Sequence, residues 1–366
     1  MCVFGTRPEA IKMAPLVEAI RGDDAFECIV CVTAQHREML DQAMDIFGLK
    51  ADYDLDLMRP GQTLTSITAG VLEGMETVLK QTEPDLVLVH GDTTTSFAAG
   101  LAAFYQRIPV GHVEAGLRSY DLLSPYPEEM NRCVTDRLAL LHFAPTAQNV
   151  ANLAAEGITA GVYKTGNTVI DALHRMVRPG YVFHSAQLRD IPLEKQTVLL
   201  TAHRRENLGK GMRQIFAAVQ QLCAAYPELQ FIYPVHPNPQ VRQLAQQMLG
   251  GLPQVRLIDP LDVQDMHNLI SRVYFVMTDS GGLQEEAPAL GKPVLVLRTE
   301  TERPEAVEMG TVRMAGIETA QIVRLARQLL EDPAEYDKMA NAVNPYGDGT
   351  ASAQICAALK EYFGLI

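Results

Sequence analysis

The sequence VYFVMTDSGGLQEE, residues 273–286, contains the pattern that decides the fold. Its first five residues predict a buried strand, and the residues after Ser280-Gly281-Gly282 predict a helix. A strand that leads through glycines into a helix presents backbone amides at the helix N-terminus, where the helix dipole favours an anion. Glu286 lies one helical turn further on, where its carboxylate can bind both hydroxyls of a ribose. The stretch therefore predicts a binding site for a nucleoside diphosphate.

The same alternation of apolar strands and amphipathic helices runs through the whole chain. Strands are predicted at 1–4, 28–32, 86–90, 109–113 and 162–165, and then at 197–201, 230–235, 255–258, 273–277, 294–297 and 311–314. Helices are predicted at 8–21, 36–47, 63–81, 93–106, 127–140, 146–155, 210–225, 239–249, 262–271, 281–289, 303–309 and 318–331. Continuous Val, Leu and Ile strands between helices indicate parallel sheets covered on both faces. The predicted fold class is α/β, with two doubly wound, Rossmann-like parallel-sheet domains that face a cleft.

The length of 366 residues exceeds the usual size of a single core, so two domains are expected. The stretch 166–195 is the weakest in core-forming residues and is predicted to be the linker. A second break at 344–349 precedes a final helix, which is expected to cross back onto the first domain. The predicted domains are 1–167 with 350–366, which carries the acid/base residues, and 168–349, which binds the nucleotide.

Composition and charge exclude several classes of protein. The net charge of −13 argues against nucleic acid and acidic membranes as partners. No apolar run approaches the roughly 18 to 20 residues of a membrane span, and no signal segment is visible, so a cytoplasmic location is expected. Six cysteines are too sparse for a disulfide framework, and Cys28 and Cys31 are predicted to be core thiols. The acidic stretch 52–56 is predicted to be a solvated loop.

In open parallel sheets, ligands bind beyond the carboxyl ends of the strands. Arg7 and Lys12 follow the first strand and suit a phosphate or a leaving pyrophosphate; the alternative is that they are surface cations. Asp92 and Glu114 follow two neighbouring strands. Because such strands lie about 4.8 Å apart, the two carboxylates can share one crevice and divide acid and base work. The alternative for Asp92 is the N-cap of the following helix.

Four more candidates follow from similar positions. Glu128 and Glu129 begin a helix, and we expect only Glu128 to be functional, because early glutamates are also favoured by the helix dipole. His203 follows the strand 197–201 and can donate to phosphate or transfer a proton, although it could also pack in a turn. His236 follows the strand 230–235 in the same way, but a purely structural role is a stronger alternative for it than for His203. The side chain of Arg303 is expected to move onto the sugar or phosphate of the bound ligand.

Absent motifs narrow the choice further. No G-x-G-x-x-G follows a strand, so NAD is not supported, and neither an NTPase phosphate loop nor a G-x-S-x-G elbow occurs. The remaining histidines show no compact ligand spacing. The sequence therefore predicts no metal site and no cofactor.

Taken together, these residues resemble the bacterial non-hydrolysing UDP-N-acetylglucosamine 2-epimerases, which have a glycosyltransferase-B-like fold. The resemblance covers almost the whole chain. It rests on residues 5–15, 33–38, 90–95, 112–118, 127–129, 166–171, 203–206, 279–286 and 301–306.

The resemblance implies reversible epimerisation at carbon 2 between UDP-N-acetylglucosamine (UDP-GlcNAc) and UDP-N-acetylmannosamine (UDP-ManNAc), for bacterial surface polysaccharide synthesis. UDP would leave as the carbon 2 proton is removed, giving 2-acetamidoglucal, and would then re-add. The implied catalytic residues are Asp92, Glu114, Glu128 and His203. The implied substrate-binding residues are Arg7, Lys12, Ser280, Gly281, Gly282, Glu286 and Arg303.

The resemblance also implies a homodimer and, in some members, activation by a second UDP-GlcNAc. The residues that it implies for the activator are Gln35, Glu38, Glu128, Arg204 and His236. Gly61 stands where activated members have an arginine contact, so obligate activation is not expected. The alternatives are a glycosyltransferase of the same fold, a hydrolysing epimerase, and a nucleotide-sugar-binding regulator without catalysis.

Overall fold

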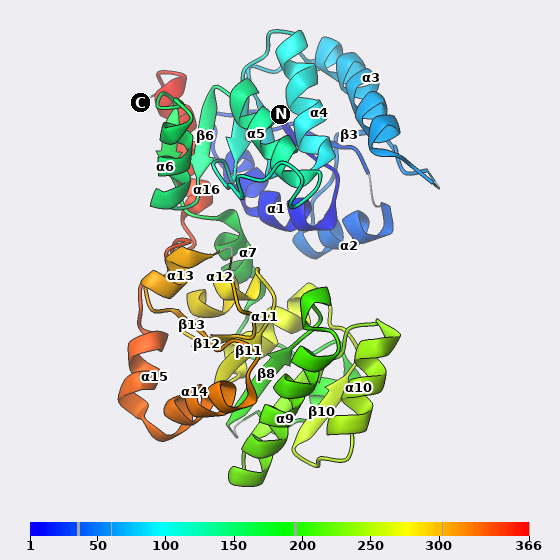
Figure 1. Cartoon of the computed structure of the whole chain (residues 1–366). Helices are drawn as coiled ribbons and strands as arrows, with labels where there is room; N and C mark the ends of the chain where they lie inside the picture. The colour runs from blue at the N-terminus through cyan, green and yellow to red at the C-terminus, as the bar shows by residue number, and fades with distance from the viewer. Residues whose placement is uncertain (35–36, 60, 194–195, 302, 366) are drawn as a thin grey trace. The chain divides into compact units, whose positions relative to one another are not determined.

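The computed structural model describes residues 1–34, 37–59, 61–193, 196–301 and 303–365 (Figure 1). The chain divides into two compact units. Unit 1 contains Met1–Ala172 and Tyr346–Ile366, and unit 2 contains Leu173–Pro345. Both changes of unit therefore lie within a few residues of the breaks expected at 167 and 350.

Unit 1 is built on a parallel sheet that has seven strands in the described residues, in the order β3-β2-β1-β4-β5-β6-β7. The strands are β1 (Cys2–Phe4), β2 (Val30–Val32), β3 (Tyr53–Asp54), β4 (Val87–His90), β5 (Val110–Val113), β6 (Leu141–Ala144) and β7 (Val162–Lys164). The order reverses between β1 and β4, which is the switch point of a doubly wound sheet. A ligand is therefore expected beyond the carboxyl ends of β1, β4 and β5.

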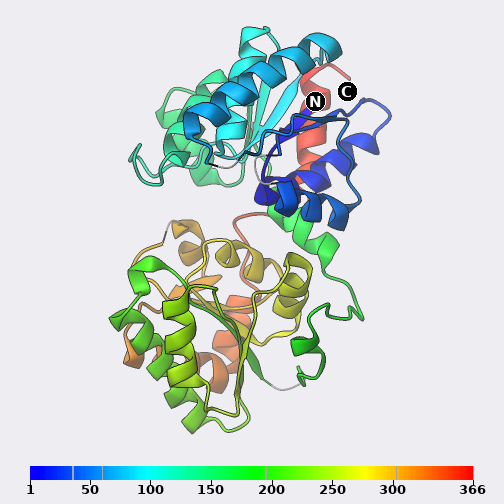
Figure 2. The ribbon, with the colours of Figure 1, turned by 90° about the vertical axis from the view of Figure 1, so that its right-hand side faces the viewer.

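The helices of unit 1 are α1 (Arg7–Arg21), α2 (Arg37–Phe47), α3 (Leu64–Thr82), α4 (Thr94–Tyr105), α5 (Glu128–Leu138), α6 (Ala147–Ala155) and α16 (Ala351–Tyr362), and α7 (Thr168–Met176) spans the change of unit. The last helix, α16, packs against α1 (Figure 2). Its N-terminus is held by Asp171, whose carboxylate accepts from the amides of Ala351 and Ser352. The end of the chain is thereby fixed to unit 1.

Unit 2 repeats this plan with a parallel sheet of order β10-β9-β8-β11-β12-β13. Its strands are β8 (Thr197–Thr201), β9 (Gln230–Pro234), β10 (Val255–Ile258), β11 (Phe275–Thr278), β12 (Val294–Val296) and β13 (Val312–Met314). Its helices are α8 (Ala186–Arg189), α9 (Lys210–Ala225), α10 (Pro239–Leu249), α11 (Val263–Arg272), α12 (Leu283–Ala289), α13 (Pro304–Glu308), α14 (Thr319–Glu331) and α15 (Pro333–Ala340), with a 3₁₀ turn η1 (Arg205–Asn207). The switch point lies between β8 and β11.

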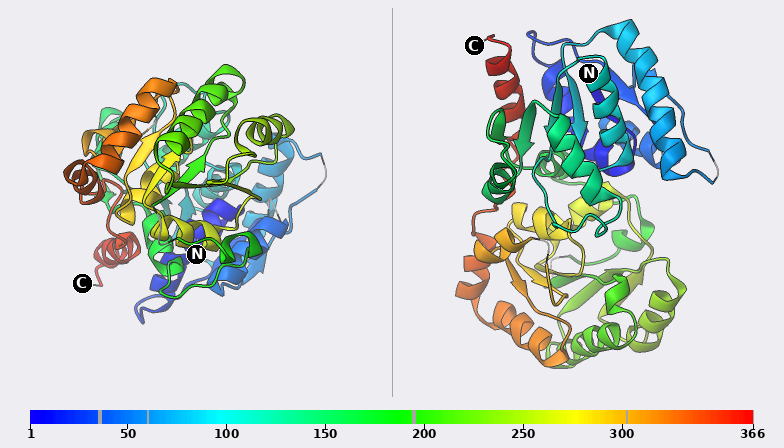
Figure 3. Two further views of the ribbon diagram at one scale, coloured as in Figure 1. Left: turned by 90° about the horizontal axis from the view of Figure 1, so that it is seen from below. Right: turned by 45° about the horizontal axis from the view of Figure 1, so that its top comes forward.

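Both faces of each sheet are covered by helices. In unit 2, α9 and α14 lie side by side over one face of the sheet (Figure 3). Phe216 of α9 and the strand residues Phe231 and Phe275 are fully buried in this core. This double coverage explains why the strands are continuous apolar runs. Among the described residues, no helix is both long and apolar enough to cross a membrane.

The elements that were not predicted are β3, β6, α8, α15 and the turn η1. β6 directly follows an apolar helix end and contains His142, so its four residues do not stand out as a strand. The ring of His142 is accommodated because its Nε2 lies 2.8 Å from the carbonyl oxygen of Asp136. β3 has only two residues and pairs with β2.

β3 lies inside the acidic stretch 52–56, which is therefore not simply a solvated loop. Asp54 and Asp56 both bind Arg37, and Asp52 binds Arg21. The acidic residues tie β3 to α1 and α2.

Cys28 and Cys31 were both predicted to be buried in the core, and this is correct only for Cys31. Cys31 is buried in β2, whereas Cys28 precedes the strand and is half-buried.

Candidate active site

Glu114 is the centre of a charged cluster beyond the carboxyl end of β5. Its side chain is 7% exposed and lies 2.6 Å from Nζ of Lys12 and 3.0 Å from Nε2 of His90. The amide of Asn167 donates to the same carboxylate at 3.3 Å. Burial alone would raise the pKa of Glu114, but attraction to Lys12 and His90 outweighs it and holds the pKa well below its usual range. Glu114 is therefore ionised at neutral pH.

The backbone of Glu114 is also unusual. Its φ of 68° lies in the left-handed region, which costs a residue other than glycine about 1 kcal/mol or more. The neighbouring Gly91 has a φ of 64°, and a Cβ added there would lie 3.6 Å from Oε2 of Glu114. The turns after β4 and β5 thus approach each other closely, and Asp92 follows directly in the first of them.

Asp92 is half-buried and forms an ion pair with Arg132 of α5, at 2.5 Å. The side chain of Asn131 donates to the Asp92 carbonyl. The N-cap of α4 is Thr93, whose hydroxyl accepts from the Ser96 amide, so the structural alternative for Asp92 is wrong. Its carboxylate is therefore not used by the helix that follows it.

The turn after β1 is held by Glu9, a residue that the sequence did not single out. Its carboxylate accepts from the amides of Gly5 and Thr6 and from the hydroxyls of Thr93 and Ser96. The fit around Gly5 is tight, because an added Cβ would lie 2.0 Å from the Thr33 hydroxyl oxygen. Glu9 therefore fixes the turn after β1 to the start of α4.

Arg7 is exposed at the first position of α1, whereas Lys12 contacts Glu114. Glu128 is half-buried at the first position of α5. Glu129 is 1% exposed and accepts from the amides of Ser119 and Tyr120. This is the structural role that its position predicts.

In unit 2, Asp279 organises the loop that carries His203. It is fully buried, and one carboxylate oxygen accepts from the amides of His203 and Arg204 and from the side chain of Asn207. Its other oxygen lies 3.2 Å from Nδ1 of His203. Asp279 therefore turns Nδ1 of His203 inward and leaves Nε2 for a ligand.

His203 and His236 belong to one cavity. Their rings stack at a centroid distance of 5.5 Å. The cavity has a volume of about 280 Å³, and its lining includes both histidines together with Ser280, Gly282 and Glu286. Burial, opposed by Asp279 but helped by His236, lowers the pKa of His203. Because Nδ1 faces the Asp279 carboxylate, a neutral His203 presents a bare Nε2 at the carboxyl ends of β8 and β11, and it can donate to a phosphate oxygen only when the ring is protonated.

We expected the backbone amides of Ser280, Gly281 and Gly282 to be available to a ligand, and this expectation is wrong for Ser280. The Ser280 amide donates to the hydroxyl of Thr278, two residues earlier. Gly281 lies against Arg303, since a Cβ there would be 3.4 Å from the guanidinium carbon. Arg303 is held at this place by Glu285, at 2.8 Å. Arg303 thus lies beside the glycine turn, as a phosphate-binding cation would.

Glu286 has a partner that the sequence did not reveal. His267 of α11 is 2% exposed, and its Nε2 lies 3.2 Å from Oε2 of Glu286. His90, Asp279 and His267 bind partners that are distant along the chain, whereas Glu9 binds both the distant Thr93 and Ser96 and the adjacent turn at Gly5 and Thr6. The spacing of Thr6 and Glu9 is that of a capping box, a local signal that could have identified Glu9, whereas the contacts of His90 and His267 form only in the folded unit.

The residues implied for an activator are divided. Gln35 lies outside the described residues, and for Glu38 of α2 only the backbone is described. Arg204 is half-buried, and its amide is bound to Asp279. His236 lines the same cavity as His203, so its position favours a role in the nucleotide site.

One group among the described residues has metal-like spacing: His184, Asp262 and Asp265. Asp262 caps α11, and Asp265 accepts from the Tyr181 hydroxyl and from the amides of His184 and Ser185. These bonds give the group a structural role in holding 181–185 to α11.

The chain is similar to known proteins over its whole length. The family model described as UDP-N-acetylglucosamine 2-epimerase matches residues 18–360. The UDP-N-acetylglucosamine 2-epimerase of Bacillus subtilis is 53% identical over 365 residues, which cover 100% of this chain and 95% of that protein. The UDP-N-acetylglucosamine 2-epimerase of Escherichia coli K12 is 52% identical, and the match covers 98% of this chain and 98% of that protein.

Solved structures agree with the sequence relatives. The UDP-GlcNAc 2-epimerase of Neisseria meningitidis, bound to UDP-GlcNAc, is 48% identical, with a TM-score of 0.84 and coverage of 98% of this chain and 99% of that one. A sucrose-phosphate synthase of Thermosynechococcus elongatus is 14% identical, with a TM-score of 0.66 over 100% of this chain and 99% of that one. The second likeness shows the glycosyltransferase-B-like fold alone, whereas the family match and the relatives of about 50% identity show more. The chain belongs to the UDP-N-acetylglucosamine 2-epimerases, a family of isomerases.

Proposed function

We propose that this chain interconverts UDP-GlcNAc and UDP-ManNAc by eliminating UDP to form 2-acetamidoglucal and adding it back. The carrying observation is the buried, ionised Glu114 in contact with Lys12, next to the turn of Asp92. The hydrogen on carbon 2 has no adjacent carbonyl, so its removal must be coupled to departure of UDP from carbon 1. Unit 1 supplies the acid/base residues and unit 2 the UDP site.

In this mechanism Asp92 and Glu114 exchange the carbon 2 proton on opposite faces, and Glu128 positions the sugar or shares that work. Arg7, Lys12 and His203 stabilise the negative charge that develops on departing UDP, together with the turn at Gly281 and Gly282. Glu286 binds the ribose, and Arg303 the diphosphate or sugar. The same contacts retain UDP until it re-adds.

The test is incubation of the full chain with UDP-GlcNAc in D₂O. The expected product is UDP-ManNAc with deuterium at carbon 2, detected by NMR and mass spectrometry. Free N-acetylmannosamine with UDP would indicate a hydrolysing epimerase instead. Transfer of the sugar only when an acceptor is added would indicate a glycosyltransferase, and binding without any turnover would indicate a regulator.

We also propose that a second UDP-GlcNAc is not obligatory. The support is Gly61, where activated members of the family have an arginine contact. Purified UDP-ManNAc alone is expected to react without a lag, with a hyperbolic dependence on its concentration. A reaction that starts only after traces of UDP-GlcNAc are added would contradict this.

We further propose a homodimer, which the resemblance implies, and a cytoplasmic location. A cytoplasmic location suits an enzyme that acts on nucleotide sugars. Light scattering of the purified chain is expected to give twice its mass of 40.2 kDa. Use in surface polysaccharide synthesis belongs to the same proposal.

A further inference from the structure

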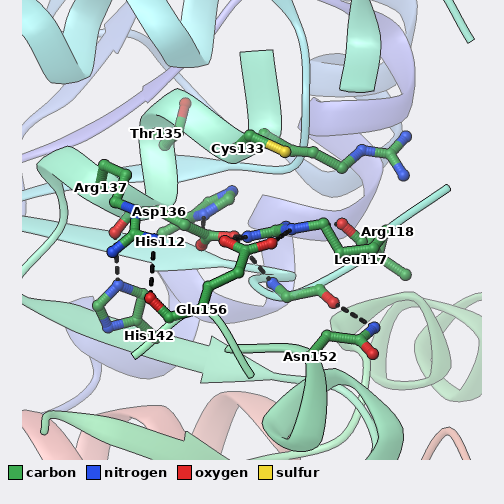
Figure 4. Close-up of polar contacts among 12 residues, drawn as sticks. His112, Leu117, Arg118, Cys133, Thr135, Asp136, Arg137, His142, Asn152 and Glu156 are labelled. Atoms are coloured by element: carbon green, nitrogen blue, oxygen red, sulfur yellow. Dashed lines mark hydrogen bonds and ion pairs between the residues drawn. The ribbon is translucent and has the colours of Figure 1, made fainter. Parts of the chain in front are cut away.

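A buried network of charges in unit 1 joins side chains from α5, β5 and the loops after β5 and α6 (Figure 4). Its centre is Asp136 of α5, whose side chain is fully buried. One carboxylate oxygen lies 2.6 Å from Nδ1 of His112, and the other lies 2.8 Å from Arg118. Arg118 is also bound by Glu156, at 2.6 Å. None of these four residues has a role in the proposed reaction.

The hydrogen-bond partners of His112 indicate how many protons its ring carries. Its Nδ1 faces the Asp136 carboxylate, and its Nε2 lies 2.7 Å from the carbonyl oxygen of Gly91. Both partners are acceptors, so a neutral ring would place a bare nitrogen against an oxygen in one of the two contacts. Asp136 is also paired with the fully buried Arg118 and accepts from the Gly116 amide, and both contacts favour the ionised carboxylate whatever the state of His112, so Asp136 does not supply the missing proton.

The charges of the network balance if His112 is cationic. The groups that face the ring are Asp136 from α5, Arg118 from the loop after β5 and His142 from β6, with Glu156 behind Arg118. Burial lowers the pKa of His142, which keeps that ring neutral. Two cations then meet two carboxylates, which avoids an uncompensated buried charge.

We propose that His112 is doubly protonated and acts as a positioning residue, which holds the turn of Asp92 against Asp136. The Gly91 carbonyl that it binds directly precedes Asp92. The oxygen of Asp136 that binds Arg118 also accepts from the Gly116 amide, two residues after Glu114. One buried carboxylate thus sets the position of both candidate acid/base turns. The catalytic part of this inference rests on the proposed function, whereas the double protonation does not.

The first test is ¹⁵N NMR of the full chain labelled in histidine, at pH 7.5, with His112 assigned by its loss in the His112→Gln variant. Two protonated ring nitrogens are expected. A neutral tautomer with one unprotonated nitrogen would overturn the proposal, whether or not the chain is an epimerase.

The second test compares His112→Asn, His112→Gln and His142→Asn. Asn places its amide near the position of Nδ1, and Gln near that of Nε2, so only Gln can still donate to the Gly91 carbonyl. His112→Asn is expected to lower kcat about 100-fold with little change in KM, because a displacement of about 1 Å has that effect. His112→Gln should recover part of the loss.

His142 is the matched control, because it pairs with His112 in the sheet register and is 2% exposed, but its Nε2 lies beside the carbonyl oxygen of Asp136 and not beside that of Gly91. Equal losses in the two Asn variants, or no recovery with Gln, would overturn the positioning role. If the wild type has no epimerase activity, the positioning role of His112 is tested by the NMR chemical shifts of the backbone amides of Asp92 and Gly116. They should shift strongly in His112→Asn and only weakly in His142→Asn, and similar shifts would refute the proposal.

Discussion

Replacing Glu114 with glutamine is expected to lower kcat by about 10² to 10⁴, the usual contribution of a general acid or base. Affinity for UDP should change much less than kcat, since most of the proposed UDP contacts lie in unit 2 and Lys12 keeps its charge in the variant. Glutamine keeps the size of the side chain, and Lys12 is 22% exposed, so water can solvate the ammonium group once the carboxylate is gone. The loss should therefore be one of chemistry, measured by steady-state kinetics and UDP titration.

Hydrogen exchange at carbon 2 gives this variant a sharper readout. If Glu114 and Asp92 serve opposite faces, Glu114→Gln should abolish exchange with solvent from one epimer and spare it from the other. Asp92→Asn should show the reverse pattern. Loss from the same epimer in both variants would contradict the division of work between the two carboxylates.

Asp171→Asn provides a control for the loss of a buried carboxylate in unit 1. Asp171 caps α16 and has no contact with the Glu114 cluster among the described residues. Its substitution should lower stability by about 1 kcal/mol, as loss of a helix cap does, and leave kcat unchanged. Wild-type kcat in Glu114→Gln would refute the catalytic role of Glu114.

Much of the fold could be predicted because each sheet is covered on both faces. Strands such as β4 and β11 begin with three consecutive apolar residues, so they stand out between amphipathic helices. β6 could not be recognised, because four residues that follow a helix directly carry no periodicity of their own. β3 depends on pairing with β2 and on the ion pairs of Arg37, which are tertiary facts.

The same distinction applies to the site. Lys12 and Glu114 were candidates because both follow strands at a switch point, and the structure brings them into contact. Asp136 was not a candidate, because it lies inside a helix, where a lone aspartate is usually solvent-exposed. Its partners His112 and Arg118 are distant in sequence, and no local pattern predicts a network that only the packed unit forms.

Replacing Arg118 with methionine is expected to lower the free energy of unfolding by about 3 to 5 kcal/mol. The guanidinium is fully buried between Asp136 and Glu156, so removing it leaves two carboxylates short of a partner. Methionine retains much of the apolar stem, so the loss comes mainly from charge. Because a domain is stable by about 5 to 15 kcal/mol, unit 1 should become marginal. Urea unfolding followed by circular dichroism measures the change.

Arg137→Met is the matched control for this variant. Arg137 is exposed and donates to the carbonyl of Glu156, and its charge reaches the Glu156 carboxylate from the solvent side, so its loss should stay within about 0.5 kcal/mol. A cost of less than about 1 kcal/mol for Arg118→Met would mean that the two carboxylates find other compensation, and the network would then not be what holds the turns.

Acid should reduce the difference between Arg118→Met and the wild type. The pKa of Asp136 is about 2 in the folded chain, where His112 and Arg118 overcome the effect of burial, and about 3.9 in an unfolded chain. A lowered folded pKa contributes stability that is complete above the unfolded value and is lost as the pH falls through the folded value. The wild type therefore loses this contribution, about 2 kcal/mol, between about pH 4 and pH 2. Methionine at position 118 removes part of it at every higher pH, so the two unfolding curves should converge below pH 4. Curves that stay parallel down to pH 2 would show that the substitution acts through packing, and that Arg118 does not stabilise Asp136 by its charge.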